Sequence, residues 1–340
     1  MNLSRCGPCR RGAVTVAAHH ARRRDAVRDA VRESPRHRSR LTIALSAVYL
    51  IWGTSFMFSK IGVSHLPPTM FSACRFLLAG TGLTLLARLW RKNLWPSRAR
   101  DWRDILITGF FMVVLSNGLS IWSLQFISSG ESALLASTIA LWIALFGSFG
   151  RRGHPLNLMA WCGLSLGVIG TALTLSPRLT MGPGIAVPYM VTLAGCLAWS
   201  IATLYYRHAD TQLGPLMFIG LQMFTGGLMQ LAIAGLLGEW PQWHASVPGL
   251  LALSYLAVFS SGLAYTSYGW LTRNTTPAIL GSFSYVNPAI ATLVGWLFLH
   301  EKLLPIQFAG MLVVLTGVAL VTSSGTTPPD DKGLEEPTPP

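Results

Sequence analysis

Residues 163–176 read GLSLGVIGTALTLS, and residues 310–323 read GMLVVLTGVALVTS. A shift of 147 positions along the chain brings the first stretch onto the second. The coinciding residues are Gly163 with Gly310, Gly170 with Gly317, Ala172-Leu173 with Ala319-Leu320, and Ser176 with Ser323. The chain therefore contains an internal repeat, and these two stretches lie at the ends of its two copies.

Ten apolar runs occupy most of the chain, and each is long enough to cross a hydrocarbon layer about 30 Å thick as a helix. The runs are 41–63, 67–88, 104–127, 130–150, 156–176, 185–206, 215–238, 247–271, 277–299 and 303–323. The composition agrees, because 51% of the 340 residues are hydrophobic and only 11% are charged, whereas soluble domains have about 25% charged residues. We therefore predict an all-α membrane protein with ten transmembrane helices.

Each copy of the repeat holds five of these runs, the first copy within 41–176 and the second within 185–323. Because five is an odd number, the second copy enters the membrane in the opposite direction to the first. Inverted-topology repeats are typical of secondary transporters, which work by alternating access about a site between the halves. The alternative is an ancient duplication in a membrane protein that transports nothing.

The net charge of +13 comes mainly from the first forty residues and from the loop between the second and third runs. This concentration does not favour nucleic acid as a partner, because the basic residues are not spread over a globular surface. If the N-terminus is cytoplasmic, the outer loops hold only Arg178 and Lys302, as the positive-inside rule requires. The sequence thus predicts a multi-pass protein of the inner (cytoplasmic) membrane with both termini in the cytoplasm.

The two ends of the chain are predicted to be disordered cytoplasmic tails, a basic one over 1–40 and a Pro-rich one over 324–340. Two alternatives remain open for the first tail. It could lie as a helix on an anionic membrane surface. Its Arg-rich, acid-poor composition also resembles an organellar transit peptide, which is removed from the mature protein.

Several short motifs, in order along the chain, resemble those of the EamA family within the drug/metabolite transporter superfamily. The motifs are Trp52-Gly53-Thr54-Ser55-Phe56, Arg75-Phe76, Tyr285-Val286-Asn287-Pro288, His300-Glu301-Lys302, and Gly310 with Gly317. Arg273-Asn274 is also similar to the YedA-type exporters of that family. The resemblance covers about residues 45–323. It implies ten helices in two bundles of five, and an exporter of small metabolites, amino acids or drugs.

The first copy of the repeat departs from this family pattern in its fourth run. The shift of 147 positions puts Leu141 where the proline of the pattern should be, and His154 where the glutamate should be. The resemblance therefore does not imply a kink in this run.

Arg75 is the strongest candidate for a functional residue inside the membrane. It lies about eight residues past Pro67, or roughly 12 Å deep, and an ionisable group at such a depth indicates function by default. Three roles are open: Arg75 could bind a substrate carboxylate, cap helix carbonyls, or pair with Glu131. Lys60, near the outer end of its run, is expected to extend its amine towards the interface.

Polar and aromatic residues near the middle of the runs are further candidates for a substrate pathway. They are Trp52, Ser55, Asn117, Trp142, Trp199, Tyr265, Tyr285 and Asn287. Aromatic walls with a few polar groups suit amphipathic organic substrates. Helix packing or anchoring at the interface is the alternative for any one of them. Pro288 is predicted to kink its run and to act as a hinge.

All thirteen acidic residues lie in tails, in loops or at the ends of the apolar runs. Because proton-coupled transporters usually relay protons through buried acids or histidines, this distribution favours facilitated diffusion or exchange. The sequence also lacks the clustered carboxylates or paired histidines of membrane enzymes, so we expect no enzyme, no catalytic residue, no metal and no cofactor. The expected partners are a small-molecule substrate and membrane lipid, and a homodimer is left open. A lipid-carrier flippase and a non-transporting membrane protein are the alternative functions.

Overall fold

The computed structural model describes residues 35–90, 95–149, 156–179, 183–275, 283–301 and 304–323. In the first half of the chain the elements are α2 (Pro35–His65), α3 (Pro68–Leu89), α4 (Ala99–Thr108), the π-helix η1 (Gly109–Asn117), α5 (Gly118–Ser123), α6 (Ser129–Ser137), α7 (Ile139–Gly147) and α8 (Leu158–Leu179). In the second half they are α9 (Pro183–His208), α10 (Pro215–Leu236), the short 3-10 helix η2 (Trp240–Gln242), α11 (Val247–Tyr255), the π-helix η3 (Leu256–Ala264), α12 (Tyr265–Asn274), α14 (Phe283–Leu299) and α15 (Pro305–Ser323). Every regular element within these residues is a helix.

Contacts divide the chain into two units, 1–46 and 47–340, and the site described below lies entirely in the second. Of the first unit the structure describes only 35–46, which belong to α2. Because α2 begins at Pro35, residues 35–40 are helical although the sequence predicts a disordered tail there. Proline is well suited to the first turn of a helix, where its missing N–H is not needed. The remainder of that tail and the whole of 324–340 lie outside the described residues.

Ten apolar stretches of the described chain correspond to the ten predicted runs, with ends that differ by a few residues. Seven are long and apolar enough to cross a membrane: Ser39–His65, Pro68–Leu89, Ala99–Ser123, Ser129–Gly147, Ala186–His208, Pro215–Leu236 and Val247–Thr272. Three are shorter: Leu158–Thr174, Val286–Leu299 and Pro305–Val321. The predicted all-α fold class with ten membrane helices is confirmed.

The repeat is visible in the helix boundaries themselves. Helix α10 begins and ends exactly 147 residues after α3, and η3 begins and ends 147 residues after η1. Each copy therefore places a nine-residue π-helix at the same point of its third membrane helix. A π-helix of this kind is rare, and it often marks a functional site.

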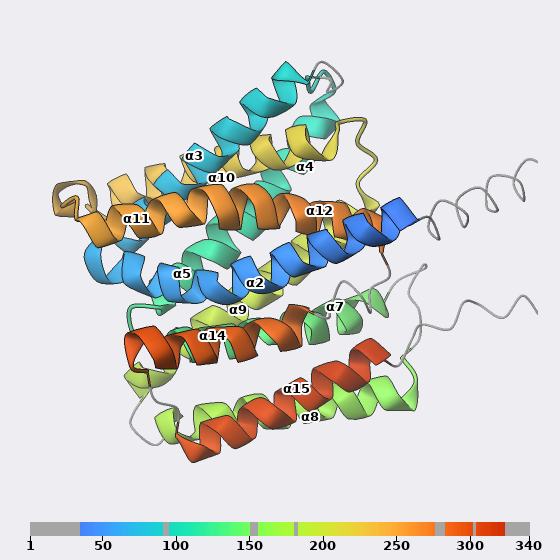
Figure 1. Ribbon diagram of the computed structural model, residues 1–340, viewed down its shortest axis with the longest axis vertical. Coiled ribbons are helices and arrows are strands. Elements are labelled where there is room, and N and C mark those ends of the chain that lie inside the picture. Colours follow the sequence, from blue (N-terminus) through green and yellow to red (C-terminus); the bar gives the residue numbers. More distant parts are fainter. Residues whose placement is uncertain are drawn as a thin grey trace, which may run out of the picture. The chain divides into compact units, whose positions relative to one another are not determined.

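Helices that correspond to each other in the two copies pack side by side. Helix α3 lies along α10, α8 lies along α15, and α6 packs against α14 (Figure 1). Glycines allow the first two contacts, because a Cβ atom at Gly163 would lie 2.6 Å from the Gly317 carbonyl oxygen, and one at Gly80 would lie 2.4 Å from the Phe224 nitrogen. Close backbone approach at small residues is a general mode of helix association in membranes.

The fourth membrane helix is interrupted between α6 and α7, although Leu141 replaces the proline of the family pattern. Hydroxyl groups explain the interruption, since Ser137 Oγ donates to the Leu134 carbonyl at 2.6 Å and Thr138 Oγ1 donates to the Leu135 carbonyl at 2.7 Å. Such bonds compete with the helical hydrogen bonds of the backbone. Helix α14, in contrast, continues through Pro288.

The glycine contacts predict opposite effects of one substitution at two positions of α3. Gly80→Ala is expected to destabilise the protein by about 1–3 kcal/mol, because the new methyl group overlaps the α10 backbone. Gly82→Ala is expected to be neutral or stabilising by up to about 1 kcal/mol, because its Cβ has no atom within 4 Å and alanine favours helices. Thermal unfolding of the purified variants in detergent measures both. Equal shifts in Tm would refute the packing argument.

Candidate functional site

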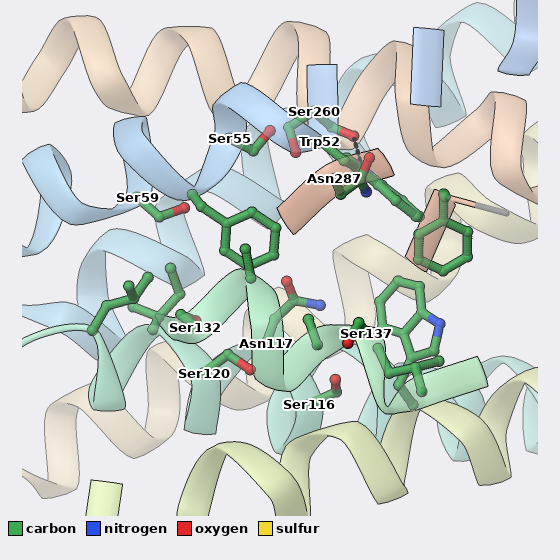
Figure 2. A pocket seen from close by; sticks show the side chains of 18 of the residues that line it. Trp52, Ser55, Ser59, Ser116, Asn117, Ser120, Ser132, Ser137, Ser260 and Asn287 are labelled. Atoms are coloured by element: carbon green, nitrogen blue, oxygen red, sulfur yellow. Dashed lines mark hydrogen bonds between the residues drawn. The ribbon is translucent and has the colours of Figure 1, made fainter. Parts of the chain in front are cut away.

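A cavity of about 130 Å³ lies among the membrane helices of both repeats. Seven of the nine predicted pathway residues line it, as does the predicted hinge Pro288; the seven are Trp52, Ser55, Arg75, Asn117, Trp199, Tyr265 and Asn287. Figure 2 shows serine, asparagine and tryptophan side chains from several helices around this space. The structure does not place Trp142 there, and the side chain of Tyr285 lies outside the described residues.

Trp142 instead lines a second, larger cavity of about 710 Å³, formed by α7, α8 and α9. Its ring stacks on Phe146 with centroids 5.8 Å apart. Leucines, Trp161 and Val168 make most of the other lining apolar. The second cavity is thus mainly apolar, and the hydroxyl groups in its lining are those of Thr138, Ser165 and Thr171.

Five rings, which we call the aromatic cluster, pack against one another beside the first cavity, and all but Tyr268 line it: Trp52, Trp199, Tyr265, Tyr268 and Phe283. Trp52 is central, with its ring 5.7 Å from Trp199, 5.1 Å from Tyr268 and 5.5 Å from Phe283. Trp52 and Trp199 are 147 residues apart, so they occupy the same position in the two repeats. The two repeats thus meet at a pair of equivalent tryptophans.

Arg75 is buried, with 5% of its surface exposed, and it connects α3 to the π-helix η3. Its Nε donates to Ser261 Oγ at 2.8 Å, and its Nη2 donates to Ser260 Oγ at 3.1 Å. The expected alternative of a pair with Glu131 is wrong, because the ion pairs among the described residues are Arg100–Asp210 and Arg103–Asp104. Among the described residues, serine hydroxyls and not helix carbonyls accept hydrogen bonds from the guanidinium, whose carbon also lies 4.8 Å from the centroid of the Phe76 ring.

The equivalent position in the second repeat is Gln222, 147 residues after Arg75. Gln222 lies on α10, and its Nε2 donates to Met112 Sδ of η1 at 3.1 Å. At this position, each repeat therefore has a residue that hydrogen-bonds the π-helix of the other repeat. The side chain at this position is charged in the first repeat, where it is Arg75, and neutral in the second, where it is Gln222.

Side chains from other positions also bind carbonyl groups of the two π-helices. Trp52 Nε1 donates to the Ser260 carbonyl at 3.3 Å, and Gln230 Nε2 donates to the Val113 carbonyl at 2.9 Å. Asn117 Nδ2 donates to the Met112 carbonyl at 2.7 Å. Since Trp52 and Asn117 also line the cavity, an occupant that moves them would disturb these bonds.

Serines form much of the polar lining, and only Ser55 among them is predicted from the sequence. The others are Ser59, Ser116, Ser120, Ser132, Ser137, Ser260 and Ser284. The spacing of four residues between Ser55 and Ser59, and between Ser116 and Ser120, places each pair on one helix face, and this signal could have found them. Three buried atoms at the cavity have no hydrogen-bond partner among the described residues: Ser132 Oγ, Ser284 Oγ and Asn287 Oδ1.

Lys60, which is expected to extend its amine towards the interface, reaches the turn after α5. Its amine donates to the Leu124 carbonyl at 2.6 Å and to the Ile127 carbonyl at 2.9 Å. The carbonyls at a helix C-terminus lack intrahelical partners and carry partial negative charge, so they attract a nearby amine. These hydrogen bonds make Lys60 a structural link between α2 and the turn before α6.

Two carboxylates bind the N-terminal end of α6, on the other side of the same turn. Glu301 accepts hydrogen bonds from the Ser129 nitrogen at 2.9 Å and the Ser129 hydroxyl at 2.6 Å. Glu131 accepts from Tyr189 at 2.7 Å and from Gln307, and it forms a capping box with Ser128. Both carboxylates lie at the positive end of a helix dipole, which stabilises them.

The sequence and the structure both match known proteins. The model of the EamA-like transporter family matches residues 40–176 and 187–323. The chain is 30% identical over 282 residues to the Escherichia coli K12 protein named "Uncharacterized inner membrane transporter YedA", covering 82% of this chain and 89% of that protein. It is 24% identical over 299 residues to the Bacillus subtilis "Uncharacterized transporter YvbV", covering 84% and 92%. A solved crystal structure, 20% identical, matches with a TM-score of 0.61 over 84% of this chain and 98% of that one, a likeness of fold.

The Lys60 contacts predict a loss of stability when the amine is removed. Lys60→Met keeps the length of the side chain but leaves the Leu124 and Ile127 carbonyls without this donor. We expect a destabilisation of about 1–3 kcal/mol, measured as a lower Tm of the purified protein. Arg98→Met, at an exposed position before α4, is the control and should change Tm little. An unchanged Tm in Lys60→Met would contradict the assigned role.

Proposed function

Because the chain belongs to the EamA-like transporter family, we propose that this membrane transporter exports small metabolites, amino acids or drugs by alternating access. The cavity lined by both repeats carries this proposal. It combines an aromatic cluster with hydroxyl and amide groups, which suits an amphipathic organic molecule. Its place among the helices of an inverted repeat agrees with the midplane sites of secondary transporters.

The equivalent tryptophans support the alternating-access part of the proposal. Trp52 and Trp199 come from the first helix of each repeat, and their rings contact each other beside the cavity that both line. In the proposed cycle, a rocking of one repeat against the other separates this pair and opens the cavity to one side of the membrane. The cavity then closes to the opposite side.

The two π-helices are the segments that we assign to this rearrangement. Each is held by side chains of the cavity or of neighbouring helices, through Trp52, Arg75 and Gln230. A π-helix bonds residues five positions apart, instead of four as in an α-helix, so a change between the two forms shifts the backbone while its hydrogen bonds are kept. Movement of η1 and η3 would couple the binding of substrate in the cavity to the conformations of both repeats.

We place the protein in the cytoplasmic membrane, with its repeats at 41–176 and 185–323 and both termini in the cytoplasm. The arginines and lysines of the inner loops support this orientation. Reporter enzymes fused to each end are expected to be active only on the cytoplasmic side. Activity of either fusion on the outer side would reverse the orientation.

A lipid-carrier flippase is the second candidate, and the second cavity favours it. That cavity is larger and almost wholly apolar, as an acyl or prenyl chain would require. Trp142 belongs to it and not to the first cavity. The two candidate functions therefore depend on different tryptophans.

Growth of cells that express the protein, on a panel of toxic amino acids, nucleobases and cationic drugs, tests the proposed export. We expect resistance to one chemical class, at least about tenfold weaker in Trp52→Ala and retained in Trp142→Ala, by the usual magnitude for a buried aromatic anchor. Membrane levels of each variant are measured as a control. Resistance that depends on Trp142 alone would favour the flippase.

When the purified protein is reconstituted in proteoliposomes, its transport of the same compounds is expected to proceed without a pH gradient. The acidic residues of the described chain have partners outside the cavity, so no carboxylate there is available to relay protons. Transport that requires an imposed pH gradient, and that an uncoupler abolishes, would contradict exchange or facilitated diffusion.

A further inference from the structure

Arg75 carries a positive charge that no carboxylate of the described chain neutralises. Among the described residues that line the cavity, none is an aspartate or a glutamate. The ion pairs within the described residues, Arg100–Asp210 and Arg103–Asp104, use other arginines. The described part of the cavity wall therefore has a net charge of +1.

The six carboxylates of the described chain are all engaged elsewhere. Asp101 accepts from Thr211, Asp104 from Arg103 and Tyr205, and Asp210 pairs with Arg100. Glu239 caps the start of α3, while Glu131 and Glu301 cap the start of α6. None of these contacts involves Arg75, so the protein's own described acids do not supply its counter-ion.

The guanidinium still has donors to offer. Nε and Nη2 each donate to one serine hydroxyl, and Nη1 has no hydrogen bond to the described residues. Neutral hydroxyls satisfy donors but do not neutralise a charge. An isolated charge within a membrane is unfavourable, and intramembrane charges usually pair or bind a substrate.

The position equivalent to Arg75 in the second repeat carries a neutral residue, Gln222. Gln222 holds η1 as Arg75 holds η3, and it does so without a charge. A link between the second helix of one repeat and the π-helix of the other therefore does not need a guanidinium. The positive charge of Arg75 is therefore not required for the link to η3.

We propose that the cavity binds its substrates through a carboxylate group that Arg75 neutralises, with the apolar part of the substrate against the aromatic cluster. The inference deepens the proposed function and rests on it. Ser132, Ser284 and Asn287, whose buried oxygens have no partner among the described residues, bind further polar atoms of the substrate. Organic cations are excluded by the same charge, although the aromatic rings alone would suit them.

Binding of three probes with one skeleton tests the proposal on the purified, full-length protein. The probes are 3-phenylpropionate, 3-phenylpropionamide and 3-phenylpropylammonium, which differ in the charge of the head group. Tryptophan fluorescence reports binding, because Trp52 and Trp199 line the cavity. We expect the carboxylate to bind at least about tenfold more tightly than the amide, the usual margin of a charge-assisted hydrogen bond, and the ammonium to bind most weakly. Equal or tighter binding of the amide or the ammonium, or no binding of the carboxylate, would overturn the proposal.

Arg75→Gln introduces the residue that the second repeat already has at this position. It is expected to lower the ratio of carboxylate affinity to amide affinity from at least about tenfold to about one. Arg103→Gln is the control, because Arg103 lies on α4, is largely exposed and does not line the cavity. A carboxylate preference that survives in Arg75→Gln overturns the proposal. If this variant does not fold, the ranking of the three probes on the wild-type protein decides.

Uptake of the same probes into proteoliposomes separates this inference from the proposed function. Transport of the amide and the ammonium as fast as the carboxylate would leave the transporter in place and refute carboxylate recognition. Arg75-dependent binding of the carboxylate without transport of any substrate would support the inference and count against export.

Discussion

Inside a lipid bilayer no water is present to bond backbone N–H and C=O groups, so every such group must find a partner within the protein. A regular α-helix meets this demand by itself, whereas η1, η3 and the interruption between α6 and α7 change the spacing of the backbone hydrogen bonds. Side chains also bond carbonyl groups there, through Gln230 to Val113, Trp52 to Ser260, and the hydroxyl of Thr138 to Leu135. These irregular segments face the cavity, where irregular backbone is tolerated at membrane depth.

The same demand governs the helix ends at the turn between the third and fourth membrane helices. Lys60 binds carbonyls after α5, and Glu301 binds the first nitrogens of α6, so each charge lies at the helix end of opposite polarity. Because Lys60 belongs to the first repeat and Glu301 to the second, the turn between the third and fourth membrane helices is held from both halves. When the two halves move relative to each other, either these hydrogen bonds break or the turn moves together with one half. The hydrogen bonds of Lys60 and Glu301 are therefore expected to matter for transport.

The sequence is informative where a property is local to one segment. The ten runs could be predicted because each must be apolar to match the bilayer, and several residues of the cavity lining because polar atoms at mid-membrane are rarely accidental. The π-helices could not, since an apolar segment such as Gly109–Asn117 reads alike in either helical form, and its partners lie more than a hundred residues away. The hydrogen bonds of Lys60 could not be predicted for the same reason, because the carbonyls it binds lie beyond a distant helix. Trp142 has the residue type of a pathway residue, but its helix turns it towards another cavity.

Duplication explains the equivalent residues in the cavity lining and also where its asymmetry matters. Trp52 with Trp199, and Ser137 with Ser284, are equivalent pairs that both contribute to the lining. Arg75 and Gln222 are equivalent in position, and each hydrogen-bonds the π-helix of the other repeat, but only Arg75 is charged. Equivalent residues can offer similar contacts in the two halves, whereas the charge of Arg75 has no equivalent in the second repeat. This asymmetric position is therefore the one that we propose distinguishes a substrate of defined charge from others that fit the same space.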